Sequence, residues 1–142
     1  MTRLVIAVAL VLSLGGCAIW GPEGGPGGAG LQGPSAGSTP PPVDAVSGAD
    51  GVQRVSVEVG DDLRFTPSVV RARPGEIEFV FHNTGSTPHD ARFLVPGEPA
   101  TGNLNGGQNG TVRVTVSEPG TYPFPCLYHD SSGMVGQLIV TP

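Results

Sequence analysis

The chain contains no lysine, and its seven arginines are outnumbered by twelve aspartates and glutamates. Without a basic surface it has no means of holding a phosphate backbone, so we expect no nucleic-acid partner. No stretch repeats apolar residues at the 3.6-residue period of an amphipathic helix. We therefore expect one small acidic domain built from β-strands.

Long apolar runs are also missing. The longest one, near the N-terminus at residues 4–14, is too short to span a bilayer comfortably. It follows Arg3 and leads into a Leu-Gly-Gly-Cys sequence that ends at Cys17, which resembles a bacterial lipobox. We expect a lipoprotein signal peptide at 1–16 and lipidation of Cys17. The alternative is an ordinary secretory signal that is cleaved beyond Cys17.

The chain has only two cysteines, Cys17 and Cys126. In an exported protein two cysteines would ordinarily suggest one disulfide. Here each has another use, because Cys17 would carry the lipid and Cys126 is the only other thiolate available to a metal. We therefore rank a disulfide between them below lipid plus metal.

Apolar side chains are scarce over residues 17–50, and half of residues 21–50 are Gly or Pro. Such a segment buries too little apolar surface to offset the entropy of ordering it, so we expect a flexible tether after the lipidated cysteine. Residues 21–35 form five consecutive Gly-x-y triplets, which are too few for a collagen-like triple helix. We therefore expect a monomer.

Beyond residue 50 apolar and polar residues alternate, as in strands with one buried face. Short strands separated by Gly- and Pro-rich turns are typical of an all-β Greek-key sandwich, here of seven or eight strands over residues 51–142. The connection at 96–110 is the least predictable part. The clearest predicted strands are 52–59, 69–73, 76–82, 91–95, 111–116, 120–126 and 137–141.

A pattern of potential metal ligands stands just before the last predicted strand. Cys126, His129 and Met134 are spaced as C-x-x-H-x-x-x-x-M. Two imidazoles and one thiolate in a trigonal set, with a long axial methionine, form a blue-copper electron-transfer site. The second imidazole is available upstream at His89, after a turn marked by Gly and Pro.

Both segments together resemble the plastocyanin/pseudoazurin branch of the cupredoxins. The motifs are N-x-G-x-x-x-H, which ends at His89, and Y-x-F-x-C-x-x-H-x-x-x-G-M-x-G, which starts at Tyr122. The resemblance implies a single-electron carrier rather than an enzyme. It also implies one type 1 copper ion with four ligands: His89, Cys126, His129 and Met134.

The resemblance extends to residues around the metal. Asn83 opens the upstream motif. Asp90 stands where plastocyanins commonly have Asn, so its N–H can point at the sulfur but its side chain is less suited to bridging the two loops. Tyr128 stands where plastocyanins often have Pro, and it keeps its N–H. We therefore expect a second N–H bond to the sulfur and a higher reduction potential.

Strand parity places the thiolate. Tyr122, Phe124 and Cys126 share one face, so the sulfur points inward if the aromatic side chains lie in the core. By the resemblance, His129 shows an imidazole edge at the surface beside apolar residues such as Leu127. A redox partner would dock there, and the candidates are a c-type cytochrome, a terminal oxidase or another respiratory or photosynthetic complex.

Other functions stay open on the sequence alone. The main alternative is an extracytoplasmic lipoprotein for copper storage or delivery, although this chain lacks the Met- or His-rich stretches that such proteins tend to use. A tethered sandwich for adhesion or assembly is a third possibility. No His-x-His pair exists to build a multicopper cluster. We expect an electron carrier outside the cytoplasm, lipid-anchored to a bacterial membrane at its outer face or in the periplasm.

Overall fold

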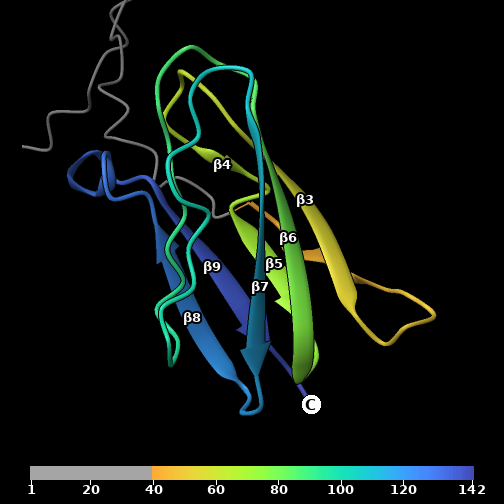
Figure 1. Ribbon diagram of the computed structural model, residues 1–142. Helices are drawn as coiled ribbons and strands as arrows, with labels where there is room; N and C mark the ends of the chain where they lie inside the picture. The colour runs from red at the N-terminus through yellow and green to blue at the C-terminus, as the bar shows by residue number, and fades with distance from the viewer. Residues whose placement is uncertain (1–39) are drawn as a thin grey trace, which may run out of the picture. The chain divides into compact units, whose positions relative to one another are not determined.

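The computed structural model describes residues 40–142, which form two β-sheets packed on one another (Figure 1). The predicted signal peptide at 1–16, the lipidation site Cys17 and most of the predicted tether lie outside the described residues. Within the described part, the one helix is η1 (Asp130–Ser132), and no helix there is long and apolar enough to cross a membrane. The predicted all-β sandwich is confirmed.

Each sheet joins strands that are distant along the chain. In the first sheet the order is β1 (Val43–Asp44), β5 (Val69–Ala72), β9 (Val135–Val140) and β8 (Gly120–Pro125). In the second it is β2 (Val46–Ser47), β3 (Gln53–Val59), β6 (Gly75–Asn83) and β7 (Asn109–Val116), and β4 (Phe65–Thr66) pairs with β3. Six of the seven predicted strands are observed, with ends that differ by two residues or fewer.

One apolar core lies between the sheets. Along β3 the buried Val55, Val57 and Val59 alternate with polar residues that face outward. Phenylalanine rings fill the centre of the core, with the centroids of neighbouring rings 4.6–6.4 Å apart. Ring pairs of this kind each add about 0.5–1.5 kcal/mol beyond the burial of apolar area. The rings belong to Phe65, Phe79, Phe81, Phe93 and Phe124.

The ordered sandwich begins before residue 51, the predicted start of the domain. β1 pairs in parallel with β5, and β2 pairs antiparallel with β3, so residues 43–47 join both sheets in turn. Val43 and Val46 nevertheless remain 46% and 72% exposed. These short strands add backbone pairs without burying an apolar face, and no alternation in the sequence marks them. The end of the predicted tether, 17–50, is therefore part of the sandwich.

The strand predicted at 91–95 is not observed, and β8 explains why. Arg92 and Leu94 donate their N–H groups to the carbonyls of Pro125 (3.1 Å) and Pro123 (3.0 Å). Proline has no N–H with which to return these bonds, so the pairing stays one-sided. The segment therefore covers the outer edge of β8 without forming a ladder.

Three connections meet at the upper end of the sandwich in Figure 1. β6 leads into the loop with His89, and β8 leads through Cys126 and η1 to β9. β3 runs parallel to β6, so the turn that follows β3 lies at the same end. This end of the fold brings the predicted ligands together.

Candidate metal centre

The side chains of His89, Cys126 and His129 meet at this end of the sandwich, with ligand atoms all within 4.8 Å of one another. The Cys126 sulfur lies 3.8 Å from Nδ1 of His89 and 3.5 Å from Nδ1 of His129. Among residues 40–142, this is the one group of three or more His, Cys, Asp or Glu side chains close enough to hold a metal ion. The same nitrogen of both rings thus faces one sulfur.

Met134, the fourth predicted ligand, is buried in the same loop as Cys126 and His129. Its N–H donates to the His129 carbonyl (3.1 Å), and its carbonyl accepts the N–H of Cys126 (3.0 Å). The N–H of His129 donates in turn to the Cys126 carbonyl (3.0 Å). These bonds close the loop of residues 126–134 on itself and fix the spacing of its three predicted ligands.

Two glycines of the downstream motif are required by this geometry. Gly133 ends η1 with φ of 82°, in the left-handed region that glycine occupies without steric cost. Gly136 packs under the ring of Phe124, where an added Cβ would lie 2.1 Å from a ring carbon. The first glycine therefore shapes the loop, and the second lets the core aromatic ring lie beside it.

His89 is fully buried in the loop that follows β6. Its backbone exchanges two hydrogen bonds with Leu104, of 3.0 and 2.7 Å. Asn83 holds the turn before His89, because its amide group donates to the carbonyls of Thr87 (2.8 Å) and Leu104 (2.9 Å). Its Oδ1 accepts the N–H of Gly85 (3.0 Å). Asn83 thus supports the backbone that carries His89.

Asp90 joins the two ligand-bearing loops. Its carboxylate accepts the N–H of Leu127 at 2.7 Å, and the residue is buried. The expectation that Asp90 is less suited than Asn to bridging the loops is therefore wrong. A carboxylate oxygen accepts the same bond that an amide oxygen would accept.

The Cys126 thiol lies in a dry environment. Burial raises its pKa, whereas hydrogen bonds from the backbone N–H groups of Asp90 and Tyr128 act in the opposite direction. These causes of the shift agree with the expected pair of N–H donors at the sulfur, which stays a prediction. Fixed donors stabilise negative charge on sulfur without bringing in water.

The donor set fits copper. Burial lowers the pKa of His89, and the neighbouring His129 lowers it further, so the His89 imidazole stays neutral, as metal binding requires. A thiolate and a thioether favour Cu(I), and imidazoles suit both oxidation states. The residues present can therefore hold one copper ion.

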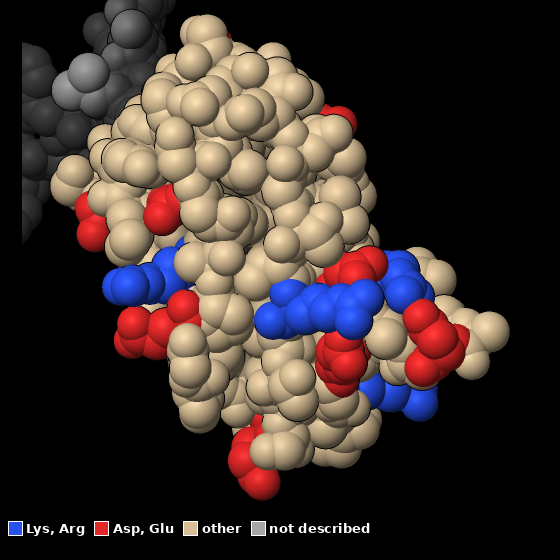
Figure 2. Space-filling view, viewed as in Figure 1, with Lys and Arg blue, Asp and Glu red and all other residues tan. Residues whose placement is uncertain are grey.

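His129 is the predicted ligand nearest the solvent, because it is half-buried while the other three are buried. Its neighbours Leu127 and Tyr128 are 49% and 56% exposed. A shallow hollow of about 460 Å³ beside the ring is lined by Pro88, Asn103, Tyr128 and His129. In Figure 2 the upper part of the visible face has almost no charged side chains.

Comparison with known proteins identifies the family. Residues 37–140 match the Cupredoxin-like domain. The plastocyanin minor isoform of Arabidopsis thaliana is 35% identical in an alignment of 106 residues, and the match covers 65% of this chain and 61% of that protein. Plastocyanin of Rumex obtusifolius is 36% identical in an alignment of 93 residues, and the match covers 57% of this chain and 93% of that protein. The chain thus spans about three fifths of the first relative and nearly all of the second.

Solved structures share the fold. The reduced auracyanin of Roseiflexus castenholzii is 22% identical, with a TM-score of 0.55 over 63% of this chain and 97% of that chain. A copper binding protein in the apo form is 23% identical, with a TM-score of 0.58 over 70% of this chain and 97% of that chain. Since the Cupredoxin-like match covers most of the sequence and the sandwich has the same fold, the chain belongs to the cupredoxins, the family of blue copper proteins.

Proposed function

We propose that this cupredoxin is a membrane-tethered type 1 copper protein that carries single electrons between redox partners. Its proposed copper ligands are His89, Cys126, His129 and Met134. The supporting observation is the approach of two imidazole Nδ1 atoms to one buried sulfur, at 3.8 and 3.5 Å. When bound there, copper supplies a one-electron couple between Cu(I) and Cu(II).

The chain's own part is to hold the ligands in one geometry that suits both oxidation states. Backbone bonds close the 126–134 loop, Leu104 fixes His89, and Asp90 ties the two loops together. Because few atoms need to move when an electron arrives or leaves, transfer can be fast. The burial of three ligands also leaves little room for a substrate, which supports a carrier rather than an enzyme.

His129 is the proposed point of electron entry and exit. Its half-buried side chain lines a hollow together with Pro88, Asn103 and Tyr128, and no charged residue lines that hollow. A partner with an uncharged apolar patch around its own redox centre fits this surface. A c-type cytochrome or a terminal oxidase could offer such a patch.

The point at which the chain enters the sandwich supports tethering to a membrane. β1 runs parallel to β5 and β5 to β9, and β9 begins directly after Met134. Pro40 lines a pocket together with Gly133 and Met134. A lipid on Cys17 would therefore be connected to the copper end by about 23 residues, a reach of at most about 80 Å. A redox partner embedded in the same membrane would lie within that reach, whether the anchored protein stands at the outer face of the cell membrane or in the periplasm.

Copper storage or delivery is the alternative. Delivery requires an acceptor protein to reach the metal, and burial of His89, Cys126 and Met134 leaves only His129 for such contact. The two functions can be distinguished by reducing the copper-loaded protein with ascorbate in the presence of a Cu(I) chelator. A carrier retains its copper and takes up one electron reversibly. A delivery protein loses the metal to the chelator after reduction.

A further inference from the structure

We propose that Asp61, in the turn between β3 and β4, is a positioning residue that fixes His89 through the turn of residues 85–87. The inference deepens the proposed function, because it rests on His89 as a copper ligand. Asp61 itself does not contact the metal cluster. It acts on the backbone that leads to His89.

The carboxylate of Asp61 gathers four donors from two consecutive residues. Its Oδ1 accepts the N–H groups of Ser86 (2.9 Å) and Thr87 (2.8 Å) and the Thr87 hydroxyl (2.7 Å). The Ser86 hydroxyl lies 3.2 Å from Oδ2. These bonds, those of Thr87 above all, lower the Asp61 pKa to about 2. The carboxylate therefore stays charged at neutral pH and keeps its acceptors available.

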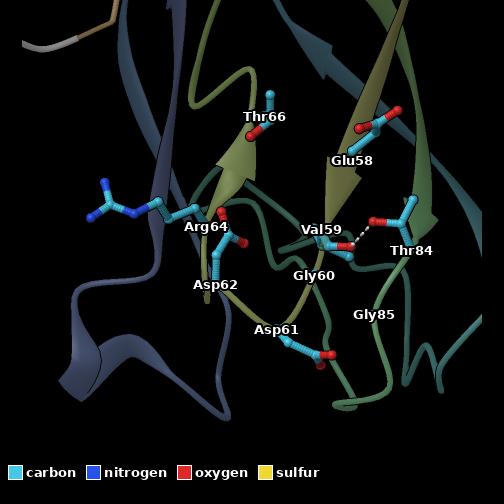
Figure 3. Close-up of a pocket in the computed structure, with 9 residues that line it drawn as sticks. All are labelled: Glu58, Val59, Gly60, Asp61, Asp62, Arg64, Thr66, Thr84 and Gly85. Atoms are coloured by element: carbon cyan, nitrogen blue, oxygen red, sulfur yellow. Dashed lines mark hydrogen bonds between the residues drawn. The ribbon is translucent and has the colours of Figure 1, made fainter.

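The turn of residues 85–87 packs closely against two other segments of the chain, at Asp61 and at Gly106. An added Cβ at Gly85 would lie 2.7 Å from the backbone nitrogen and Oδ1 of Asp61, and one at Gly106 would lie 2.7 Å from the Gly85 carbonyl. Thr84 adds two bonds to the Val59 carbonyl, of 2.9 Å from its N–H and 3.2 Å from its hydroxyl. Figure 3 shows the turn at Asp61 opposite Thr84 and Gly85. Only glycine fits where these chain segments cross.

Little freedom remains between this turn and His89. Thr87 is followed by Pro88, whose ring fixes its own φ near −65° and restricts the residue before it to extended conformations. A displacement of Thr87 is therefore passed on to His89 across one stiff residue.

Asp62 provides a matched control. It is the next residue in the chain, it is exposed, and it carries the same charge. None of the hydrogen bonds found in residues 40–142 joins Asp62 to the turn, and its side chain points toward Arg64 in Figure 3. Asp62→Asn thus removes one negative charge from the same turn, as Asp61→Asn does, whereas only Asp61 holds the backbone of residues 86 and 87.

The test compares Asp61→Ala, Asp61→Asn and Asp62→Asn in the complete protein. Asparagine keeps an acceptor oxygen for the N–H groups of Ser86 and Thr87, so Asp61→Asn should still hold the turn in part. In the copper-free protein, Asp61→Ala is expected to speed hydrogen exchange at the Ser86 and Thr87 amides by about tenfold or more. The dissociation constant for copper should rise about tenfold, as for other residues that orient metal ligands. Asp61→Asn should fall between Asp61→Ala and the unchanged protein.

The proposal is overturned if Asp62→Asn weakens copper binding as much as Asp61→Ala, or if Asp61→Ala leaves both readouts unchanged. If Asp61→Ala does not fold, Thr87→Val takes its place in the test, because it removes only the hydroxyl that donates to Asp61. It should give a smaller increase in the dissociation constant. Because amide exchange is measured without copper, it separates failure of this inference from failure of the proposed copper function.

Discussion

The Asp90 carboxylate and the Leu127 amide are joined by a hydrogen bond of 2.7 Å. This bond ties the residue after one proposed ligand, His89, to the residue after another, Cys126. A hydrogen bond from the backbone N–H of Asp90 lowers the pKa of Cys126, whereas the Asp90 carboxylate raises it. One residue therefore joins the two loops that carry these proposed ligands.

Asp90→Ala should lower the free energy of unfolding of the copper-free protein by about 1–3 kcal/mol, because it leaves the Leu127 N–H without its acceptor. Asp90→Asn should lose much less, since its amide oxygen can take the same place. Urea titration of both variants measures the difference. Equal losses in the two variants would mean that the charge of Asp90, and not its role as acceptor, is what matters.

Tyr128→Pro should lower the reduction potential, because it removes an N–H donor to the sulfur and thereby disfavours the electron-rich Cu(I) state. The loss of about 1 kcal/mol of differential stabilisation corresponds to roughly 40 mV for one electron. Tyr128→Ala keeps the N–H and loses only the ring, so its potential should remain closer to that of the unchanged protein. Voltammetry of the copper-loaded variants tests this, and an unchanged or raised potential in Tyr128→Pro would contradict it.

Gly136→Ala should destabilise the fold by about 1–3 kcal/mol, because its Cβ would overlap the buried Phe124 ring. The double variant Gly136→Ala with Phe124→Leu should lose less free energy of unfolding than the sum of the losses in the two single variants. Thermal unfolding of the four proteins of this double-mutant cycle gives the coupling. Strict additivity would show that the ring and the glycine do not constrain one another.

The stability of the copper-free protein should depend on Asp61 in acid. Its pKa in the folded state is lowered from 3.8 to about 2, so the folded state favours the charged carboxylate. The resulting stability is present above pH 4 and is lost as the pH falls through about 2. Asp61→Asn should therefore unfold with a shallower dependence on pH between these values. An identical dependence in both proteins would exclude a contribution from this carboxylate.

Much of the fold can be predicted because its signals are local. Val55, Val57 and Val59 alternate with polar neighbours, and the spacing of Cys126, His129 and Met134 matches a loop that closes on itself through its own backbone. Both features need only a short stretch of chain. Six strands and the cluster of His89 with two downstream ligand candidates followed from them.

The remainder depends on contacts that sequence spacing does not reveal. Val43 and Val46 form strands without being buried, and residues 91–95 lack a ladder because of prolines some thirty residues away. Asp61 lies 25 positions before the turn that it holds, and as an acidic residue in an exposed turn it carries no distinctive signal. Such residues become recognisable only when the chain is folded.

The most direct test of a type 1 copper site is the optical spectrum of the protein loaded with Cu(II), compared with that of Cys126→Ser. The proposed site should give an intense thiolate-to-copper charge-transfer band that ascorbate bleaches reversibly and that is missing from Cys126→Ser. Copper binding without this band, or a band that persists in Cys126→Ser, would contradict the proposal.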